Sequence, residues 1–392
     1  MRVLMTTKSG AGHFGPLVPF ARALRRSGAD VVVAAPREAA PMVRAARLPL
    51  WAVDDPPAGE RDAIFAAVRQ STQPEAKRIV GDVFARIDAR AAYPGVLAAC
   101  RVWRPDVVIS EITEFAGPLA ADAIDVPSIA VGISQQGRTE QVMPLVVPAL
   151  DELRARFDVA PDPGGARMVG RPYFTLMPEA LEDPATPRSD AALRFREVIR
   201  GPRAVLPDWW DGDQRPLIYL TFGSVAPTMD FFPGMYREAI DALALLPARV
   251  LVTIGRERDP SELGALPPNV HVERWVAQND VMPHAAAMVC HGGSGTVTMG
   301  LAAGVPTVVV PLFADQSWNS ERIAALGAGI ELPGGPDAAT DVGEAVLSLL
   351  ADPSYRHTAE RIAAQMQSLP PVEAAVGVVR DLLAERGSRR AA

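Results

Sequence analysis

The sequence contains few cysteines and no long apolar segment. Only Cys100 and Cys290 occur among the 392 residues, and both stand among apolar neighbours, so we expect buried free thiols rather than a disulfide or a metal site. No stretch approaches the roughly 20 apolar residues that a membrane span needs. The apolar run at the N-terminus is too short for the core of a signal peptide. These absences predict a cytoplasmic protein without a membrane span.

The chain also lacks an excess of basic residues. Its formal net charge is −7 and its pI is about 5.4, which argues against a nucleic-acid partner because phosphate binding needs a basic surface. Hydrophobic residues make up 48% of the chain and charged residues 22%, so we expect well-packed cores. The length suggests two domains. Composition leaves the oligomeric state open between a monomer and a homodimer.

Short apolar runs alternate with amphipathic ones through the first half of the chain. Strands are predicted at residues 2–6, 30–35, 50–53, 106–110 and 127–132. Strands that are apolar throughout, separated by helices, indicate a parallel sheet covered on both faces. Residues 135–200 hold several prolines and glycines and are predicted to be loop-rich, and residues 201–216 are predicted to be a linker.

The second half repeats this pattern. Strands are predicted at residues 216–222, 249–254, 270–275, 288–290, 307–310 and 329–332. Two long helical patterns, at about 337–351 and 373–386, finish the chain. The predicted fold class is therefore α/β, with two successive Rossmann-like, doubly wound domains.

A glycine-rich turn follows the first strand. It reads Gly10-Ala11-Gly12-His13-Phe14-Gly15 and matches the G-x-G-x-x-G fingerprint between a strand and a helix. A dinucleotide site would also need an acidic residue after the second strand, where this chain has Pro36-Arg37. Because an arginine there suits a 2′-phosphate, an NAD(P)-dependent oxidoreductase remains an alternative.

The same turn holds a candidate catalytic base, His13. The ordinary pKa of histidine, about 6.5, suits proton transfer near neutral pH. A carboxylate usually orients such a base, and Glu111, which follows the predicted strand 106–110, is the best candidate. The competing interpretations are a helix-capping or exposed histidine and a glutamate that interacts with a helix N-terminus.

A second glycine-rich turn, His291-Gly292-Gly293-Ser294-Gly295-Thr296, lies between a predicted strand and helix. Its backbone amides and the helix N-terminus could hold a diphosphate without lysine or arginine. Asp315 and Gln316 offer hydrogen bonds to sugar hydroxyls, and Trp275 offers a flat face to a base. A serine-capped turn, a helix N-cap at Asp315 and a core tryptophan are the alternatives.

Together these motifs resemble a known family. Trp275-x-x-Gln278, the turn at 291–296, Gly304-Val305-Pro306 and Asp315-Gln316-x-x-Asn319 look like the donor-binding signature of family 1 glycosyltransferases of the GT-B fold. Thr221-Phe222-Gly223-Ser224 resembles the loop that opens the donor domain of that family. The resemblance covers nearly the whole chain and is closest to bacterial enzymes that glycosylate natural products such as antibiotics.

The resemblance implies two facing Rossmann-like domains, acceptor-binding over 1–205 and donor-binding over 206–370, with a C-terminal helix over 371–392 that packs back on the first. It implies an inverting, metal-independent transfer from a dTDP- or UDP-sugar, without a further cofactor, to a small hydrophobic aglycone. His13 would be the base and Glu111 its partner. The implied donor-binding residues are Ser224, Trp275, Val276, Gln278, His291, Gly293, Ser294, Thr296, Asp315 and Gln316.

The acceptor is expected on the first domain. Phe14, Ser134 and Met143 are candidate contacts, and Phe65 and Phe84 could line the pocket or fill the core. Two departures from the family stand out. Met299 replaces the ribose-binding glutamate of plant members, and Glu111 stands where aspartate is common.

Other functions stay open at this point. Residues 211–213 match the DxD pattern of metal-dependent glycosyltransferases, but we interpret them as a solvated turn because no apolar strand leads into them. A GT-B epimerase or hydrolase of sugar nucleotides, and a non-catalytic protein of the same fold, are further alternatives.

Overall fold

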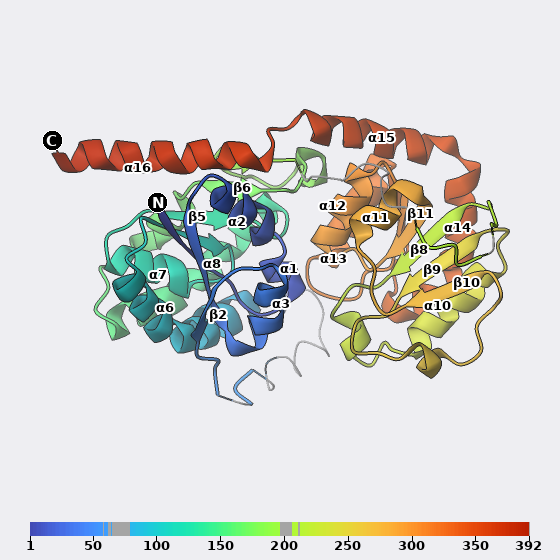
Figure 1. Cartoon of the computed structure of the whole chain (residues 1–392), viewed down its shortest axis with the longest axis horizontal. Helices are drawn as coiled ribbons and strands as arrows, with labels where there is room; N and C mark the ends of the chain where they lie inside the picture. The colour runs from blue at the N-terminus through green and yellow to red at the C-terminus, as the bar shows by residue number, and fades with distance from the viewer. Residues whose placement is uncertain (58, 62–63, 65–78, 197–205, 211, 392) are drawn as a thin grey trace. The chain divides into compact units, whose positions relative to one another are not determined.

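The computed structural model describes residues 1–57, 59–61, 64, 79–196, 206–210 and 212–391. The chain folds into two compact units (Figure 1). The first comprises Met1–Met177, Asp183–Phe195 and Pro370–Ala392, and the second comprises Pro178–Glu182 and Arg196–Leu369. The second unit thus takes up a short piece, Pro178–Glu182, from within the first half of the chain, which the sequence did not indicate.

The first unit is built on a parallel sheet of seven strands in the order β3-β2-β1-β4-β5-β6-β7. The strands are β1 (Arg2–Thr6), β2 (Asp30–Pro36), β3 (Leu50–Val53), β4 (Val107–Glu111), β5 (Ser128–Val131), β6 (Tyr173–Thr175) and β7 (Ala192–Arg194). The chain order reverses between β1 and β4, which are paired directly. Such a switch point opens a crevice at the carboxyl ends of the strands, where doubly wound folds bind ligands.

Helices cover both faces of this sheet. Val3 and Met5 of β1 point into one core, with α2 (Leu17–Arg26) and α3 (Ala40–Ala45), while Leu4 points into the other. The second core contains side chains of α6 (Ala89–Trp103), α7 (Ala116–Ala123) and α8 (Gln136–Arg156). The apolar character of the strands follows from this two-sided burial.

The prediction that residues 135–200 are loop-rich was wrong for the stretch that forms α8. Pro144 and Pro148 lie inside this helix of 21 residues. Both prolines are exposed, whereas Val142, Val146 and Leu150 are buried against the core. Two prolines spaced by four residues fall on one face, so the amide hydrogen bonds that they remove are lost on the solvent side. Tertiary packing of the opposite face outweighs this cost.

The end of the chain completes the first unit. A short helical turn, η9 (Val372–Ala374), precedes α16 (Ala375–Ala391), and both contact α2 (Figure 1). Val372, Val376 and Val379 belong to the core on the α2 face. Arg26 pairs with Glu373, and Arg386 with Asp125.

The second unit has a parallel sheet of six strands in the order β10-β9-β8-β11-β12-β13. The strands are β8 (Leu217–Thr221), β9 (Arg249–Thr253), β10 (Val270–Glu273), β11 (Ala285–Cys290), β12 (Thr307–Val309) and β13 (Gly329–Glu331). The main helices are α10 (Gly234–Ala244), α12 (Ser294–Ala302), α13 (Gln316–Leu326), α14 (Val342–Ala351) and α15 (Pro353–Ser368). Here the switch point lies between β8 and β11.

Helix α15 was not predicted. It begins immediately after α14, where the Asp352 side chain accepts a hydrogen bond from the amide of Ser354 and Pro353 occupies the first helical position. Both features are typical helix starts. Only a few of its residues are buried, among them Ile362 and Met366. Its apolar periodicity is therefore weak, which explains why the sequence did not predict this helix.

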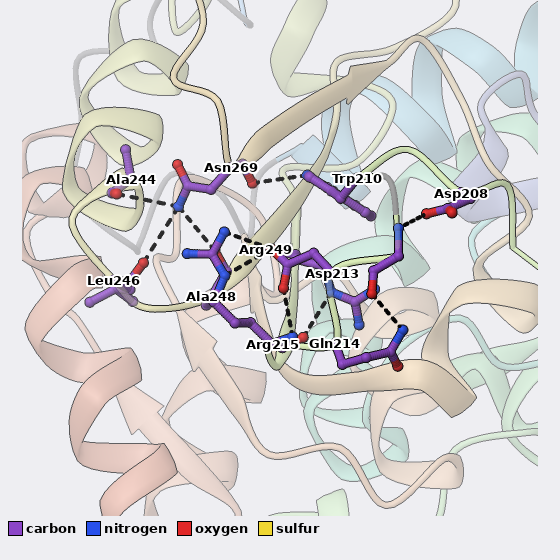
Figure 2. Close-up of polar contacts among 11 residues, drawn as sticks. Asp208, Trp210, Asp213, Gln214, Arg215, Ala244, Leu246, Ala248, Arg249 and Asn269 are labelled. Carbon is purple, nitrogen blue, oxygen red and sulfur yellow. Dashed lines mark hydrogen bonds and ion pairs between the residues drawn. The ribbon is translucent and has the colours of Figure 1, made fainter.

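Residues 206–210 and 212–215 make polar contacts with the rest of the second unit (Figure 2). The indole nitrogen of Trp210 donates to the carbonyl of Asn269 at 3.2 Å, and the guanidinium of Arg249 donates to the carbonyl of Arg215. Of the DxD pattern, Asp211 lies outside the described residues. Asp213 pairs with its neighbour Arg215 at 2.6 Å, so its carboxylate serves a local turn (Figure 2).

Among the described residues, no helix combines the length and the apolar character that crossing a membrane would require.

Candidate active site

His13 and Glu111 meet at the switch point of the first unit. His13 lies in a short helical turn after β1, α1 (Ala11–Phe14), and Glu111 is the last residue of β4. Nδ1 of His13 is 3.2 Å from Oε2 of Glu111, without the alignment of a linear hydrogen bond. The imidazole is 23% exposed and the carboxylate fully buried. The structure therefore brings together the pair predicted from the sequence, and His13 is its solvent-accessible member.

The Glu111 carboxylate is held in the charged state. Thr113 donates to its Oε1 with both the backbone amide and the hydroxyl, each at 2.7 Å. Burial by itself raises the pKa of Glu111, but the attraction of His13 and Lys8 and the hydrogen bond of Thr113 outweigh it, so the pKa lies below its ordinary value. An ionised carboxylate beside Nδ1 leaves Nε2 as the nitrogen that could accept a proton.

Glu114 has the structural role that was the alternative interpretation of Glu111. Its carboxylate accepts hydrogen bonds from the amides of Ala116 and Gly117 at the start of α7, each at 2.9 Å, and from the hydroxyl of Thr6. The macrodipole argument thus fits Glu114. Two residues separate two buried glutamates with different partners, and the sequence alone did not distinguish them.

The candidate acceptor residues occupy different environments. Phe14 and Met143 are buried in hydrophobic cores, 4% and 7% exposed. Ser134 follows β5, the neighbour of β4, and its hydroxyl has no hydrogen-bond partner among the described residues. The Phe84 ring meets the His13 ring edge to face, with centroids 5.8 Å apart. Phe65 lies outside the described residues.

In the second unit, His291 is clamped between two glycines at the β8–β11 switch point. A Cβ atom on Gly223 would lie 2.6 Å from the His291 ring, and one on Gly293 would lie 2.5 Å from its Nε2. Gly223 also has a φ of +78°, which favours glycine. Close backbone approach to this ring explains why both turns carry glycine at these positions.

His291 is neutral at physiological pH. Burial lowers its pKa to about 4, partly offset by a hydrogen bond with the Thr221 backbone. Its neutral ring brings no charge to an anion in front of α12, and its single N–H can be donated either to the Thr221 carbonyl or to such an anion. Thr296 is buried in the first turn of this helix. The exposed amides of a helix N-terminus supply the remaining attraction for an anion.

The pKa of His291 has a consequence for stability. From about pH 6.5 down to pH 4 the unfolded chain binds a proton that folded His291 does not, so the free energy of unfolding should fall as the pH falls through this window. The variant His291→Gln should lose less stability between pH 7 and pH 4.5 than the wild type, as measured by urea unfolding. Equal losses in the two proteins would contradict a buried neutral imidazole.

Asp315 joins the two helix starts of this site. Its Oδ2 accepts a hydrogen bond from the Ser294 hydroxyl at 2.7 Å. The Asn319 side chain, fully buried, donates to the carbonyl of Gly292 at 2.9 Å and to the Ser294 hydroxyl at 3.0 Å. Asp315, directly before α13, and Asn319, in its first turn, thus both direct their side chains to the turn before α12.

Gln316 differs from its predicted role in one respect. Its Oε1 accepts hydrogen bonds from the amides of Leu312 and Phe313 at 2.8 and 3.0 Å, and the side chain is 3% exposed. The oxygen therefore shapes the turn after β12. Only the amide nitrogen of Gln316 remains for a ligand.

Trp275 is 53% exposed after β10, which rules out the core interpretation. The guanidinium of Arg256, from the loop after β9, lies 4.0 Å from the centroid of its indole ring and covers one face. This cation–π contact was not predicted, because it pairs side chains from adjacent loops. Val276 is partly buried and Gln278 begins α11 (Gln278–Val281). Ser224 is exposed and Met299 partly buried.

Within the described part of the chain, no three histidine, cysteine, aspartate or glutamate side chains gather into a metal-binding cluster. Cys100 and Cys290 are both buried free thiols, as expected. Burial raises the pKa of each thiol to about 12.

Similarity to known proteins agrees with this geometry. Residues 237–382 match the family model described as the C-terminal domain of erythromycin biosynthesis protein CIII-like proteins. An L-demethylnoviosyl transferase of Streptomyces niveus is 34% identical over 97% of this chain and 98% of its own length. The elloramycin glycosyltransferase ElmGT of Streptomyces olivaceus is 31% identical over 94% of both chains.

Solved structures show the same relationship. The glycosyltransferase SnogD from Streptomyces nogalater superimposes with a TM-score of 0.80 at 30% identity, over 98% of this chain and 99% of its own. The glycosyltransferase VinC, solved in complex with dTDP, superimposes with a TM-score of 0.79 at 26% identity, over 98% of this chain and all of its own.

Two parallel doubly wound sheets, each with a polar site at its switch point, define the class of a GT-B glycosyltransferase. The chain belongs to the family 1 glycosyltransferases of this fold, in the group of bacterial enzymes from antibiotic pathways. The oxidoreductase alternative is not favoured.

Proposed function

We propose that this glycosyltransferase moves a sugar from a thymidine or uridine diphosphate sugar to a hydroxyl of a small apolar natural product, with inversion at the anomeric carbon. The observation that carries the proposal is the contact of 3.2 Å between His13 and the buried Glu111 at the β1–β4 switch point. This pair supplies a base for the acceptor in the first unit, whereas the donor motif lies in the second unit.

In the proposed reaction, Nε2 of His13 takes the proton of the acceptor hydroxyl as its oxygen attacks the anomeric carbon. The bond from that carbon to the diphosphate oxygen breaks on the opposite face, and the electron pair leaves with the nucleoside diphosphate. Glu111 stabilises the imidazolium that forms. The N-terminus of α12 and the N–H of His291 stabilise the charge that grows on the leaving group.

The donor site supports a nucleoside diphosphate sugar. One face of the Trp275 indole remains for stacking a base, with Val276 and Gln278 following it in the chain. His291, Gly293, Ser294 and Thr296 lie at the start of α12 and would hold the diphosphate together with Ser224, which is exposed in the loop after β8. Thymidine diphosphate is supported by the complex of VinC with that nucleotide. No metal ion takes part in this scheme, and no further cofactor is needed.

The experiment that tests this function is a coupled donor and acceptor assay in EDTA. The protein is incubated with dTDP-α-D-glucose or UDP-α-D-glucose and the phenolic probe 7-hydroxycoumarin, and the anomeric coupling constant of the product is measured by NMR. We expect a β-glucoside and no loss of rate in EDTA. An α-glucoside would contradict inversion, and loss of activity in EDTA would contradict the metal-free scheme. Full-rate turnover of the donor alone would favour a hydrolase or epimerase.

We also expect Asp315→Ala to weaken the binding of dTDP-glucose more than that of dTDP. A buried hydrogen bond to a charged group contributes about 1.5–3 kcal/mol, so the affinity for the sugar nucleotide should fall by about tenfold or more. Isothermal titration with both ligands measures the difference. Ser294→Ala is the matched control, because it removes the partner of Asp315 without removing the carboxylate and should weaken both ligands alike. Equal weakening by Asp315→Ala would contradict a contact with the sugar.

A further inference from the structure

Lys8 is an unusual residue in this chain. Only two of the 39 lysine and arginine residues are lysines, and the other, Lys77, lies outside the described residues. Lys8 follows β1 by two positions and leads into the glycine-rich turn that carries His13. A lysine differs from an arginine in presenting a compact charge that is easily shifted by burial.

The Lys8 ammonium is buried without a hydrogen bond. The side chain is 7% exposed, and Nζ has no hydrogen-bond partner among the described residues. It lies over the ring of Phe84, 2.6 Å from the centroid. A buried ammonium that lacks an acceptor is costly, so such a group is expected to have a partner in a functional state.

Charged neighbours set the electrostatic environment of Lys8. Burial lowers its pKa to about 7, opposed by the attraction of Glu111, Asp88 and Glu114, and supported by the repulsion of Arg61. Two of these carboxylates are already engaged, since Glu111 contacts His13 and Glu114 caps α7. Asp88 is paired with Arg61 at 2.7 Å. Lys8 is therefore close to three carboxylates, each of which already has another partner.

A small pocket opens beside Nζ in the first unit. Its inner volume is about 20 Å³, enough for about one water molecule or one oxygen atom of a ligand. Phe84, Phe115 and Val53 are among its apolar walls, and its charged groups come from Lys8, Arg61, Asp54, Asp88 and Glu114. The inner space therefore fits one acceptor oxygen of a ligand, beside apolar walls.

We propose that Lys8 is an anchor for the acceptor, donating a hydrogen bond from Nζ to a neutral oxygen of the carbonyl type on an otherwise apolar ring system. A carboxylate is disfavoured because Asp88, Glu111 and Glu114 surround the same point. Phe84 contacts both His13 and Lys8, so a single small acceptor can place its hydroxyl at the first and its carbonyl at the second. The inference rests on the proposed function, because it assigns this pocket to the acceptor.

The test uses the scarcity of lysine. In the variant Lys77→Arg, protein labelled with [ε-13C]lysine gives a single side-chain NMR signal, that of Lys8. We expect saturating 7-hydroxycoumarin, which carries a phenol and a lactone carbonyl, to move this signal and to raise the pKa of Lys8. Saturating 2-naphthol, which lacks the carbonyl, should leave the pKa unchanged. A signal that does not respond to 7-hydroxycoumarin, or that responds equally to both, would overturn the proposal.

Binding measurements provide the second arm. Lys8→Met in the same background should weaken 7-hydroxycoumarin by about tenfold or more and 2-naphthol by less than about twofold. Equal weakening of both probes would assign Lys8 a merely structural role and overturn the proposal. So would a wild type that binds neither probe, or one that binds 6-hydroxy-2-naphthoic acid more tightly than 7-hydroxycoumarin.

The anchor and the transferase can fail separately. The NMR signal reports on acceptor binding without donor or turnover. If Lys8 responds as expected and no sugar is transferred to any hydroxyl, the proposed function is wrong and the anchor stands. If sugar is transferred but the NMR signal of Lys8 does not respond to the carbonyl of 7-hydroxycoumarin, the anchor proposal is wrong and the proposed function stands.

Discussion

Replacing His13 by alanine should lower kcat by about 10²–10⁴-fold, the usual contribution of a general base, while the affinity for dTDP stays within about twofold of the wild type. The imidazole contacts Glu111 and Phe84 in the first unit, and its removal leaves the donor motif intact. Steady-state kinetics with 7-hydroxycoumarin and isothermal titration with dTDP measure the two quantities.

Two further variants make this prediction specific. His357→Ala removes an exposed histidine on α15 and should leave kcat unchanged. Glu111→Gln keeps the shape of the side chain but removes the charge that stabilises the imidazolium, so it should also lower kcat. Unchanged turnover in His13→Ala would remove this histidine from the mechanism.

Gly293→Ala should lower the affinity for dTDP by about 10–100-fold. The added Cβ would lie 2.5 Å from Nε2 of His291, so the ring must move away from the start of α12. A displaced ring loses its hydrogen bond to a charged phosphate, worth about 1.5–3 kcal/mol. Titration with dTDP, and with UDP for comparison, measures the effect.

Gly234→Ala is the control for this variant. Gly234 also lies at the start of a helix in the second unit, α10, but no atom lies within 4 Å of the position of its Cβ. Alanine there should leave dTDP affinity unchanged. If Gly293→Ala bound dTDP as tightly as the wild type, the role of the His291 turn in holding the diphosphate would be refuted.

The sheets could be predicted from the sequence because their strands are buried on both faces. Strands β1 and β3 have the predicted bounds, and the other predicted strands differ by one to three residues at an end, but β6 and β7 were not predicted. Continuous apolar runs separated by helical patterns determine this arrangement with little ambiguity. The meeting of His13 with Glu111 also depends on the strand order, which pairs β1 with β4 and was not predicted from the sequence.

The helices that escaped prediction depend on tertiary packing. In α8, a buried face outweighs the local cost of Pro144 and Pro148, which local propensity cannot show. In α15, a weakly apolar sequence is held by its cap at Asp352 and by a few buried side chains. The cap was a usable signal, because aspartate followed by proline is typical of a helix start.

The site was predictable where a motif fixes the residues in sequence, and not where it depends on contacts between loops. The turn at Gly292–Gly293 and the Asp315–Asn319 pair were identified from their spacing. Arg256 reaches Trp275 from a neighbouring loop, and the burial of Lys8 is set by helices far along the chain. Such proximity is a property of the folded chain. The scarcity of lysine was the one sequence signal that could have drawn attention to Lys8.

The placement of residues 370–392 within the first unit has a consequence for biosynthesis. Val372, Val376 and Val379 fill the core beside α2, yet they are translated after every segment of the second unit. Synthesis proceeds from the N-terminus, and domains generally fold as units while it continues. All segments of the second unit emerge before this point, so the half that is translated first is the half that is completed last. A chain released early at residue 369 would expose the apolar surface that these valines cover.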